Sequence, residues 1–370
     1  MRKGTFFFFV FFLLNALWGF TQAPSEKPYW FTLERGKLFF RTGEYGDALR
    51  AFEDAREQRK TRYAGMEQNF IALLSIPEVR GLGDSLDLVE AYISDRRQEN
   101  AAAALRELYY RIPRTSLEGS ARKALEQIGE LKNYPEAEYW IGEIYRTEGE
   151  LGIALGQYEK AHEQRALLEN PGFDGEIVYK IAAIHRLRQD YQEMERWLLE
   201  ILKQDLRWSE DSGTFARAAL SRTMENDGIL QFLTLYRYNN PFVEKAHRLL
   251  GFYYYASGRH SRAAEHLLYA FLIQNTIIID EILRGQFDFT FTGLENLRQE
   301  IARRPLLSAY TDEVEYEKTL YCLGSALYGA GKSAPAREFW TFLAGGRGEW
   351  SARAQAQLRS PTVEPAIEYP

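Results

Sequence analysis

Two glycine-containing segments have residue types that bind phosphate groups in other proteins. Gly329-Ala-Gly-Lys-Ser333 matches the end of a phosphate-binding loop, in which backbone amides, a lysine and a hydroxyl hold the nucleotide. That loop needs a glycine where this chain has Ala326, and it must follow a strand, whereas here it follows a helical pattern. Gly81-Leu-Gly-Asp-Ser85 lacks the third glycine of a dinucleotide-binding loop, so it predicts a turn in which Asp84 or Ser85 caps the next helix. We expect no nucleotide cofactor.

The histidines and the single cysteine do not have the spacing of a metal site or of a thiol enzyme. No two histidines are four residues apart, and no cysteine cluster accompanies them. Cys322 lies in an apolar helical stretch, so we interpret it as a buried small hydrophobic residue. Because it is the only cysteine, an intramolecular disulfide is excluded. The histidines are His162, His185, His247, His260 and His266.

Carboxylates are frequent on the predicted helices, for example at Glu136, Glu138, Glu143 and Glu148. Such runs normally form solvated helix faces. A carboxylate pair for glycoside hydrolysis stays open from the sequence, although no pair is singled out, and no nucleophile elbow is present. The prediction is a protein that is not an enzyme and has no catalytic, cofactor-binding or metal-binding residues.

Small residues recur with a fixed spacing. Four times a glycine is followed twelve residues later by an alanine, with a glycine-containing turn halfway between them. Apolar residues on both sides recur every three or four positions, which is a helical pattern. The spacing predicts antiparallel helix pairs that cross at small residues. The pairs are Gly36/Ala48, Gly142/Ala154, Gly251/Ala263 and Gly324/Ala336, and the turns contain Gly43, Gly149, Gly258 and Gly331.

This pattern resembles the tetratricopeptide repeat family. The family places small residues at positions 8, 20 and 27, aromatic residues at positions 11 and 24, and a turn near position 15. The best copy has Gly142, Tyr145, Gly149, Ala154, Tyr158 and Ala161. Further copies have Gly251, Tyr254, Gly258, Ala263, Leu267 and Ala270; Gly36, Phe39, Gly43, Ala48, Phe52 and Ala55; and Gly324, Leu327, Gly331, Ala336, Trp340 and Leu343. A weaker copy has Ala182, His185, Gln189, Met194, Leu198 and Ile201.

The resemblance implies one repeat domain over residues 24–359, with the clearest copies near 29–62, 135–168, 175–208, 244–277 and 317–350. The family's proline near position 32 is missing from every copy, where Lys60, Ala166, Leu206, Asn275 and Gly348 stand. The gaps between copies suggest degenerate helix pairs. We predict these at 64–75 with 85–94, 101–111 with 119–131, and 214–224 with 228–237.

Two segments depart from the helical pattern. Residues 286–292 alternate apolar and polar side chains, which predicts an extended insertion whose phenylalanines cover a seam, or else an edge strand that binds a partner. Residues 360–370 contain three prolines and predict an extended, mobile tail.

The first 23 residues predict a secretory signal peptide, because Arg2 and Lys3 precede an apolar run that is too short for a comfortable membrane span. We therefore expect export to the periplasm or cell envelope, and membrane tethering only if this segment is retained. No cysteine follows the apolar run, so a lipid-modified N-terminus is excluded. Removing the two cations changes the formal charge from −6 to −8, and this acidic balance argues against a nucleic-acid partner.

The resemblance implies an all-α, right-handed superhelix of about eight helix pairs with a concave groove lined by the first helix of each pair. Groove positions of the family are rich here in aromatic residues and arginines, which anchor many protein interfaces. They are Trp30, Phe40, Tyr139, Arg146, Tyr179, Arg186, Phe252, Tyr255, Tyr321 and Tyr328.

We therefore expect a non-catalytic scaffold or adaptor that binds other envelope proteins or peptides in this groove. Residues 137–145 are similar to repeat copies of exported bacterial proteins that act in outer-membrane assembly and envelope division. An accessory subunit of a solute transporter or a small-ligand receptor is an alternative, and it predicts a closed apolar pocket. A cell-wall enzyme with a superhelix like that of lytic transglycosylases would need a separate catalytic domain, for which helical signals from residue 30 to about 357 leave no room.

Overall fold

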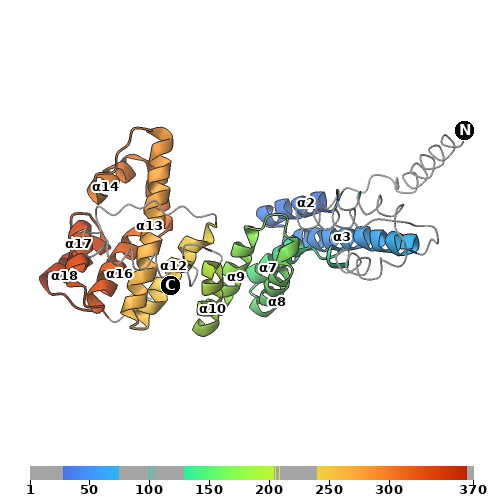
Figure 1. The fold of residues 1–370 in the computed structure, drawn as a ribbon, viewed down its shortest axis with the longest axis horizontal. Helices are drawn as coiled ribbons and strands as arrows, with labels where there is room; N and C mark the ends of the chain where they lie inside the picture. The colour runs from blue at the N-terminus through green and yellow to red at the C-terminus, as the bar shows by residue number, and fades with distance from the viewer. Residues whose placement is uncertain are drawn as a thin grey trace, which may run out of the picture. The chain divides into compact units, whose positions relative to one another are not determined.

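The computed structural model describes residues 28–74, 100, 103, 129–203, 205, 208 and 240–364 (Figure 1). The described residues are helical and contain no strand, so the protein is all-α as the sequence predicts. The chain divides into two compact units, residues 1–171 and 172–370. The predicted signal segment, the helix predicted at 85–94 and the degenerate pair predicted at 214–224 with 228–237 lie outside the described residues, as do nearly all of the pair predicted at 101–111 with 119–131 and residues 365–370 of the predicted tail.

Each unit consists of consecutive helices that pack against their neighbours in the chain. The first unit contains α2 (Tyr29–Thr42), α3 (Tyr45–Leu74), α7 (Pro135–Thr147), α8 (Leu151–Glu163) and the short 3-10 helix η2 (Arg165–Leu167). The second unit contains α9 (Phe173–Leu187), α10 (Tyr191–Lys203), α12 (Phe242–Ala256), α13 (His260–Gly285), α14 (Leu294–Arg303), α15 (Pro305–Glu313), α16 (Tyr316–Gly329), α17 (Ser333–Ala344) and α18 (Glu349–Arg359).

Five helix pairs among the described residues turn with the same backbone hydrogen bonds. In the first, the amide of Gly43 donates to the carbonyl of Phe40 over 3.2 Å, and the amide of Glu44 donates to that of Phe39 over 2.9 Å. This is the pattern of a helix end whose last residue is left-handed. The turn residues have φ between 60° and 84° and are Gly43, Gly149, Gln189, Gly258 and Gly331. Glycine takes this conformation without a Cβ clash, which explains four of the five identities.

The two helices of a pair approach closely where the first helix has glycine. A Cβ atom built on Gly36 would lie 2.5 Å from the Phe52 ring, and one on Gly251 would lie 2.5 Å from Leu267. Gly142 meets Tyr158 and Gly324 meets Trp340 in the same way, each sixteen positions later. The alanines of the spacing pattern are buried as well, and they are Ala48, Ala154, Ala263 and Ala336.

Two second helices are longer than the repeat spacing predicts. Helix α3 continues to Leu74, so residues 64–74 do not begin a separate helix. No glycine or proline stands between residues 47 and 64 to end the helix, and Gly65 has open space around its Cβ position. Helix α13 continues to Gly285, and nine of its residues 271–282 are buried, six of them Phe, Leu or Ile. Tertiary burial therefore extends α13 beyond the repeat, and α3 continues because no residue in its sequence ends the helix at the repeat boundary.

In the part of the chain that the structure describes, α13 is the one helix long and apolar enough to span a membrane, and 78% of its most apolar window is buried inside the protein. It packs between α12 and α16.

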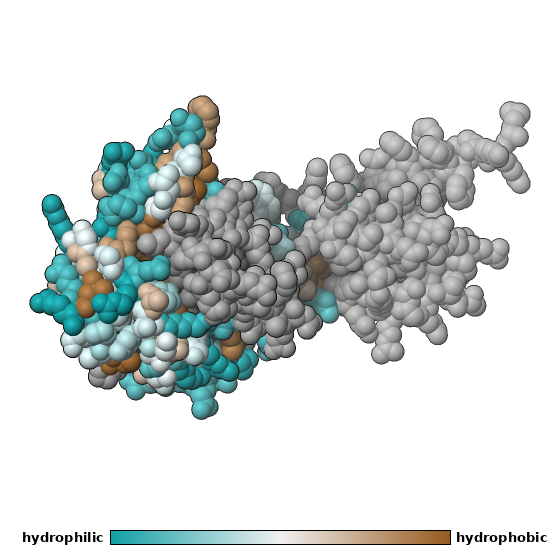
Figure 2. Space-filling model, turned by 60° about the vertical axis from the view of Figure 1, so that its left-hand side comes forward, coloured by the Kyte–Doolittle hydropathy of each residue, from teal (hydrophilic) through white to brown (hydrophobic). Residues whose placement is uncertain are grey.

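Residues 286–293 after α13 form a turn and an irregular segment, not a strand. Phe287 in this segment is 93% exposed. Figure 2 shows brown, apolar surface at the upper tip of the coloured part of the molecule.

Candidate functional site

Three tyrosines of the second unit lie on α12 and α16, each the first helix of its pair, and form part of one surface. Tyr321 and Tyr328 are seven residues apart on α16, so they lie on the same side of that helix two turns apart. Tyr255 lies at the end of α12. Gln357 and Arg353 of α18 complete the surface. We call these five residues the tyrosine face.

The tyrosine face holds an extended segment of the same chain. Helix α18 ends at Arg359, before Pro361, because proline cannot continue a helix. The hydroxyl of Tyr328 then donates to the carbonyl of Pro361 over 3.4 Å. The hydroxyl of Tyr255 donates to the carbonyl of Glu364 over 3.1 Å.

Helix α18 supplies the other contacts of this segment. The amide of Thr362 donates to Oε1 of Gln357 over 2.8 Å. The amide group of Gln357 in turn donates to the hydroxyl of Tyr321 over 3.2 Å. Residues 361–364 are therefore held along their backbone by α12, α16 and α18.

One ion pair adds an electrostatic contact between α18 and the extended segment. Nη1 of Arg353 lies 3.4 Å from Oε2 of Glu364. Burial, together with the nearby Glu364 carboxylate, raises the pKa of Tyr321 to about 12. Burial and the same carboxylate also raise the pKa of Tyr255. Both hydroxyls are therefore protonated at neutral pH; that of Tyr255 donates to the Glu364 carbonyl, and that of Tyr321 accepts the Gln357 amide.

The ten predicted groove residues occupy different environments. Trp30 is exposed, whereas Tyr139 and Phe252 are buried. Phe40 contacts Trp140 edge-on with a centroid separation of 5.5 Å, and Arg146 pairs with Glu143 over 2.9 Å. The half-buried residues are Phe40, Arg146, Tyr179, Arg186 and Tyr328, and the fully buried ones are Tyr139, Phe252, Tyr255 and Tyr321.

A buried ionic network lies beside Phe252 and has no counterpart in the sequence prediction. Glu244 and Arg248 are both buried, and Nε of Arg248 donates to Oε1 of Glu244 over 3.0 Å. Arg248 also donates to Glu315 over 2.7 Å, and Lys318 donates to the other Glu315 oxygen over 2.8 Å. Periodicity could not reveal the bond between Arg248 and Glu315, because Glu244 and Arg248 belong to α12 whereas Glu315 and Lys318 lie at the start of α16. In the structure, Glu315 of this network has a left-handed φ of 50°, which is a strained conformation for a residue with a side chain.

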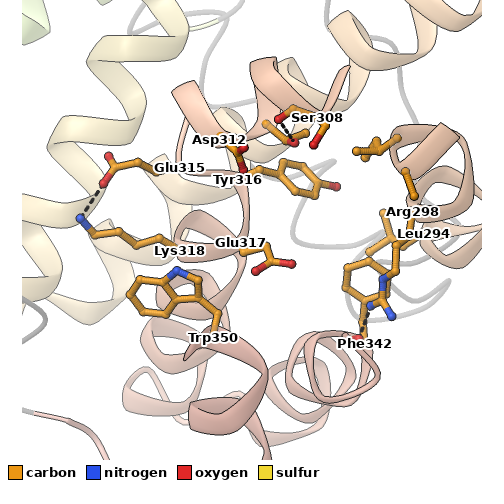
Figure 3. A pocket seen from close by; sticks show the side chains of 13 residues that line it. Leu294, Arg298, Ser308, Asp312, Glu315, Tyr316, Glu317, Lys318, Phe342 and Trp350 are labelled. Atoms are coloured by element: carbon orange, nitrogen blue, oxygen red, sulfur yellow. Dashed lines mark hydrogen bonds and ion pairs between the residues drawn. The ribbon is translucent and has the colours of Figure 1, made fainter. Parts of the chain in front are cut away.

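A cavity of about 500 Å³ lies among α14, α15, α16, α17 and α18 (Figure 3). Figure 3 shows the Glu317 carboxylate in the cavity, which Arg298 and Trp350 also line. Burial raises the pKa of Glu317, while the Arg298 guanidinium opposes the shift. Arg298 itself pairs with Glu295 over 3.2 Å and stacks 3.9 Å from the centre of the Phe342 ring. The cavity thus combines charged and apolar walls, and neither histidine nor cysteine lines it.

Two histidines that are far apart in the sequence meet in the second unit. Nδ1 of His247 lies 3.1 Å from Nδ1 of His266, and both rings are buried. Burial and the second ring hold the pKa of His247 well below its usual value, so this residue is neutral at pH 7. Within the described ranges, no group of three His, Cys, Asp or Glu residues could hold a metal ion. The pair is therefore a packed core contact with Trp208 and Tyr269.

Comparison with known proteins gives similarity without a function. No family model matches this chain. An uncharacterized protein of Treponema pallidum (strain Nichols) is 25% identical to it over 325 residues, which is 87% of each chain. Because 325 residues exceed the length of either unit, the similarity extends into both units.

Proposed function

We propose that this protein is a non-catalytic scaffold or adaptor of the tetratricopeptide type, which binds segments of other proteins on its first helices. Five helix pairs with one turn geometry support this repeat type, as do the four glycine contacts sixteen positions apart. Stacked pairs of this kind form a right-handed superhelix whose concave side binds peptides or proteins.

The tyrosine face is the observation that carries the proposal. Its hydroxyl and amide groups bind the backbone of an extended segment, and its arginine binds a carboxylate. Side-chain donors that reach main-chain carbonyls are what a surface for extended peptides requires. Tyrosine and arginine are also the residues that dominate protein interfaces.

We further propose that the protein works in the cell envelope after export. This location depends on the charged and apolar N-terminal 23 residues. Cleavage would be measured by N-terminal sequencing of the protein purified from its cells. An uncut chain found in the cytosolic fraction would contradict the location.

Site-specific photo-crosslinking in living cells tests the scaffold function. A crosslinking amino acid is placed at groove positions Trp30, Tyr179 and Tyr328, and at control positions Ile153 and Leu306, which are exposed elsewhere. We expect defined protein adducts from the groove positions and none of the same mass from the controls. Adducts of equal yield at all five positions, or none at any, would contradict a groove that binds partners.

A second candidate is a small-ligand binding protein or accessory subunit of a solute transporter, which the volume of the 500 Å³ cavity favours, although its charged side chains differ from the closed apolar pocket that this candidate predicts. The size of the cavity is within the range of small-molecule sites. Native mass spectrometry of the protein purified from its cells would detect a retained small molecule, and the ligand-free mass alone would count against this candidate.

A further inference from the structure

The tyrosine face recognises backbone more than side chains. Two carbonyls and one amide of residues 361–364 are hydrogen-bonded, whereas Val363 is 38% exposed. Such contacts select an extended conformation and tolerate changes at outward-facing positions. The segment therefore shows what kind of chain the face accepts.

The acidic residue is the exception to this tolerance. Arg353 lies between two carboxylates, 2.8 Å from Glu349 on its own helix and 3.4 Å from Glu364. It also stacks 5.1 Å from the centre of the Trp350 ring, which fixes the guanidinium on this side of α18. The Arg353 guanidinium is thus held where it can pair with the carboxylate of Glu364, the last residue of the bound segment.

The sequence repeats the bound pattern. Pro361-Thr-Val-Glu364 is followed directly by Pro365-Ala-Ile-Glu368, so two copies of proline, any residue, an aliphatic β-branched residue and glutamate stand in tandem. Proline fixes its own φ and disfavours helix in the residue before it, and β-branched residues favour extended backbone. The pattern therefore encodes an extended segment with a carboxylate at every fourth position.

We propose that the tyrosine face binds an extended acidic segment of a partner protein with the pattern proline, any residue, aliphatic residue, glutamate. Residues 361–364 of the chain itself occupy this site when the partner is absent. The inference rests on the proposed scaffold function and names its partner class. The intramolecular segment is a competitor, so a partner must displace it or present several copies of the pattern.

A peptide in solution tests the inference. The probe is a fluorescently labelled peptide of residues 360–370, and the two proteins are the chain without its signal segment and the same chain ending at Ser360. Tethering gives the intramolecular segment an effective concentration of about millimolar. We therefore expect fluorescence anisotropy to show the shortened chain binding the peptide at least ~10-fold more tightly than the full chain does.

Charge reversal supplies the matched controls. In the shortened chain, Arg353→Glu is expected to abolish binding of the natural peptide, and a peptide with Glu364→Lys and Glu368→Lys is expected to restore it. Tyr255→Phe with Tyr328→Phe removes two hydroxyls and is expected to weaken binding of both peptides. Thermal melting of each variant checks that it is folded.

The outcomes separate the two proposals. Equal peptide affinity of the long and short chains, or no binding to a folded shortened chain, overturns the inference. The scaffold function is tested separately by crosslinking from Trp30, which belongs to the other unit and is not part of the tyrosine face. Protein adducts at Trp30 together with a peptide that fails to bind would leave the scaffold proposal standing and reject this partner class.

Discussion

Arg248 and Glu315 are 67 positions apart in the chain and share a hydrogen bond of 2.7 Å between Nη1 and Oε2. The bond joins α12 to the residue that precedes α16. Arg248 is simultaneously paired with the buried Glu244, and Glu315 holds Lys318 with its other oxygen. Glu315 is left-handed, a conformation that costs a residue with a Cβ about 1–2 kcal/mol. Two charged partners offset that cost.

Replacing Arg248 by methionine is expected to destabilise the protein strongly. The change keeps much of the apolar stem but leaves the Glu244 carboxyl without its cation inside the second unit, where burial already raises its pKa. Breaking a buried pair from one side typically costs about 3–5 kcal/mol. Urea unfolding followed by circular dichroism measures the free energy. The matched control is Arg196→Met, whose pair with Glu193 is exposed and should be worth no more than about 1 kcal/mol. Equal losses in the two variants would contradict a special role for the network.

Local features of this fold were readable from the sequence, and long-range polar contacts were not. The turn glycines and the buried alanines follow from spacing, because both are set by backbone geometry within one helix pair. The Arg248–Glu315 bond joins residues of different pairs, and no local period relates them. The length of α13 was underestimated for a similar reason, since packing against α12 and α16 stabilises the helix beyond the repeat. The length of α3 was underestimated because its end was predicted from the repeat spacing and not from a residue that ends a helix.

The candidate site was predictable in part. Helical period places Tyr321 and Tyr328 on one side of α16, and the family pattern assigns both to the groove. Gln357 and Arg353 were missed because α18 begins at the last residues of the predicted copy 317–350 and lies almost wholly beyond it. Proline content predicts the extended backbone of residues 361–364, but which side chains bind that backbone depends on the tertiary fold.

Replacing Gln189 by glycine is expected to stabilise the protein. Gln189 has φ of 60° at the turn position that glycine occupies in the four other described pairs. Glycine adopts this conformation without strain, and the gain is about 1 kcal/mol after the entropy of the unfolded chain is counted. The reciprocal change Gly149→Gln should lose a similar amount. Thermal melting measures both, and a melting temperature that moves the same way in the two variants would contradict the account.

Replacing Gly142 by leucine is expected to destabilise the first unit by at least ~1–3 kcal/mol, because the added atoms overlap the Tyr158 ring. A Cβ atom alone would lie 2.8 Å from that ring. Gly156→Leu is the matched control, since Gly156 is also helical but has nothing within 4 Å of its Cβ position. The control should be neutral or slightly stabilising, because leucine favours helix over glycine. Chemical unfolding of the two variants gives the comparison, and an equally stable Gly142→Leu protein would exclude a tight crossing there.

Replacing Glu136 by glutamine is expected to stabilise the protein at neutral pH. Glu136 is buried near the start of α7; Oε1 accepts the amide of Glu169 over 2.7 Å, and Oε2 has no hydrogen-bond partner among the described residues. Burial raises the pKa of this carboxyl above its ordinary value of 4.5, although the Glu169 amide opposes the shift. The folded state therefore binds a proton more readily than the unfolded state does. Glutamine keeps the acceptor for Glu169 and removes the charge.

The pH dependence has a definite sign. The parent gains stability as the pH falls from 7 through the raised pKa of Glu136, whereas the glutamine variant has no such gain to make. The melting temperature of Glu136→Gln should therefore exceed that of the parent at pH 7, and the difference should shrink towards zero near pH 4. Glu138→Gln on the same helix is the control of opposite sign, because the Glu138 carboxylate pairs with Arg56 and Lys160. Its loss should lower the melting temperature at pH 7. A Glu136→Gln protein that melts below the parent at pH 7 would show that the buried carboxylate is stabilised by its surroundings rather than strained by them.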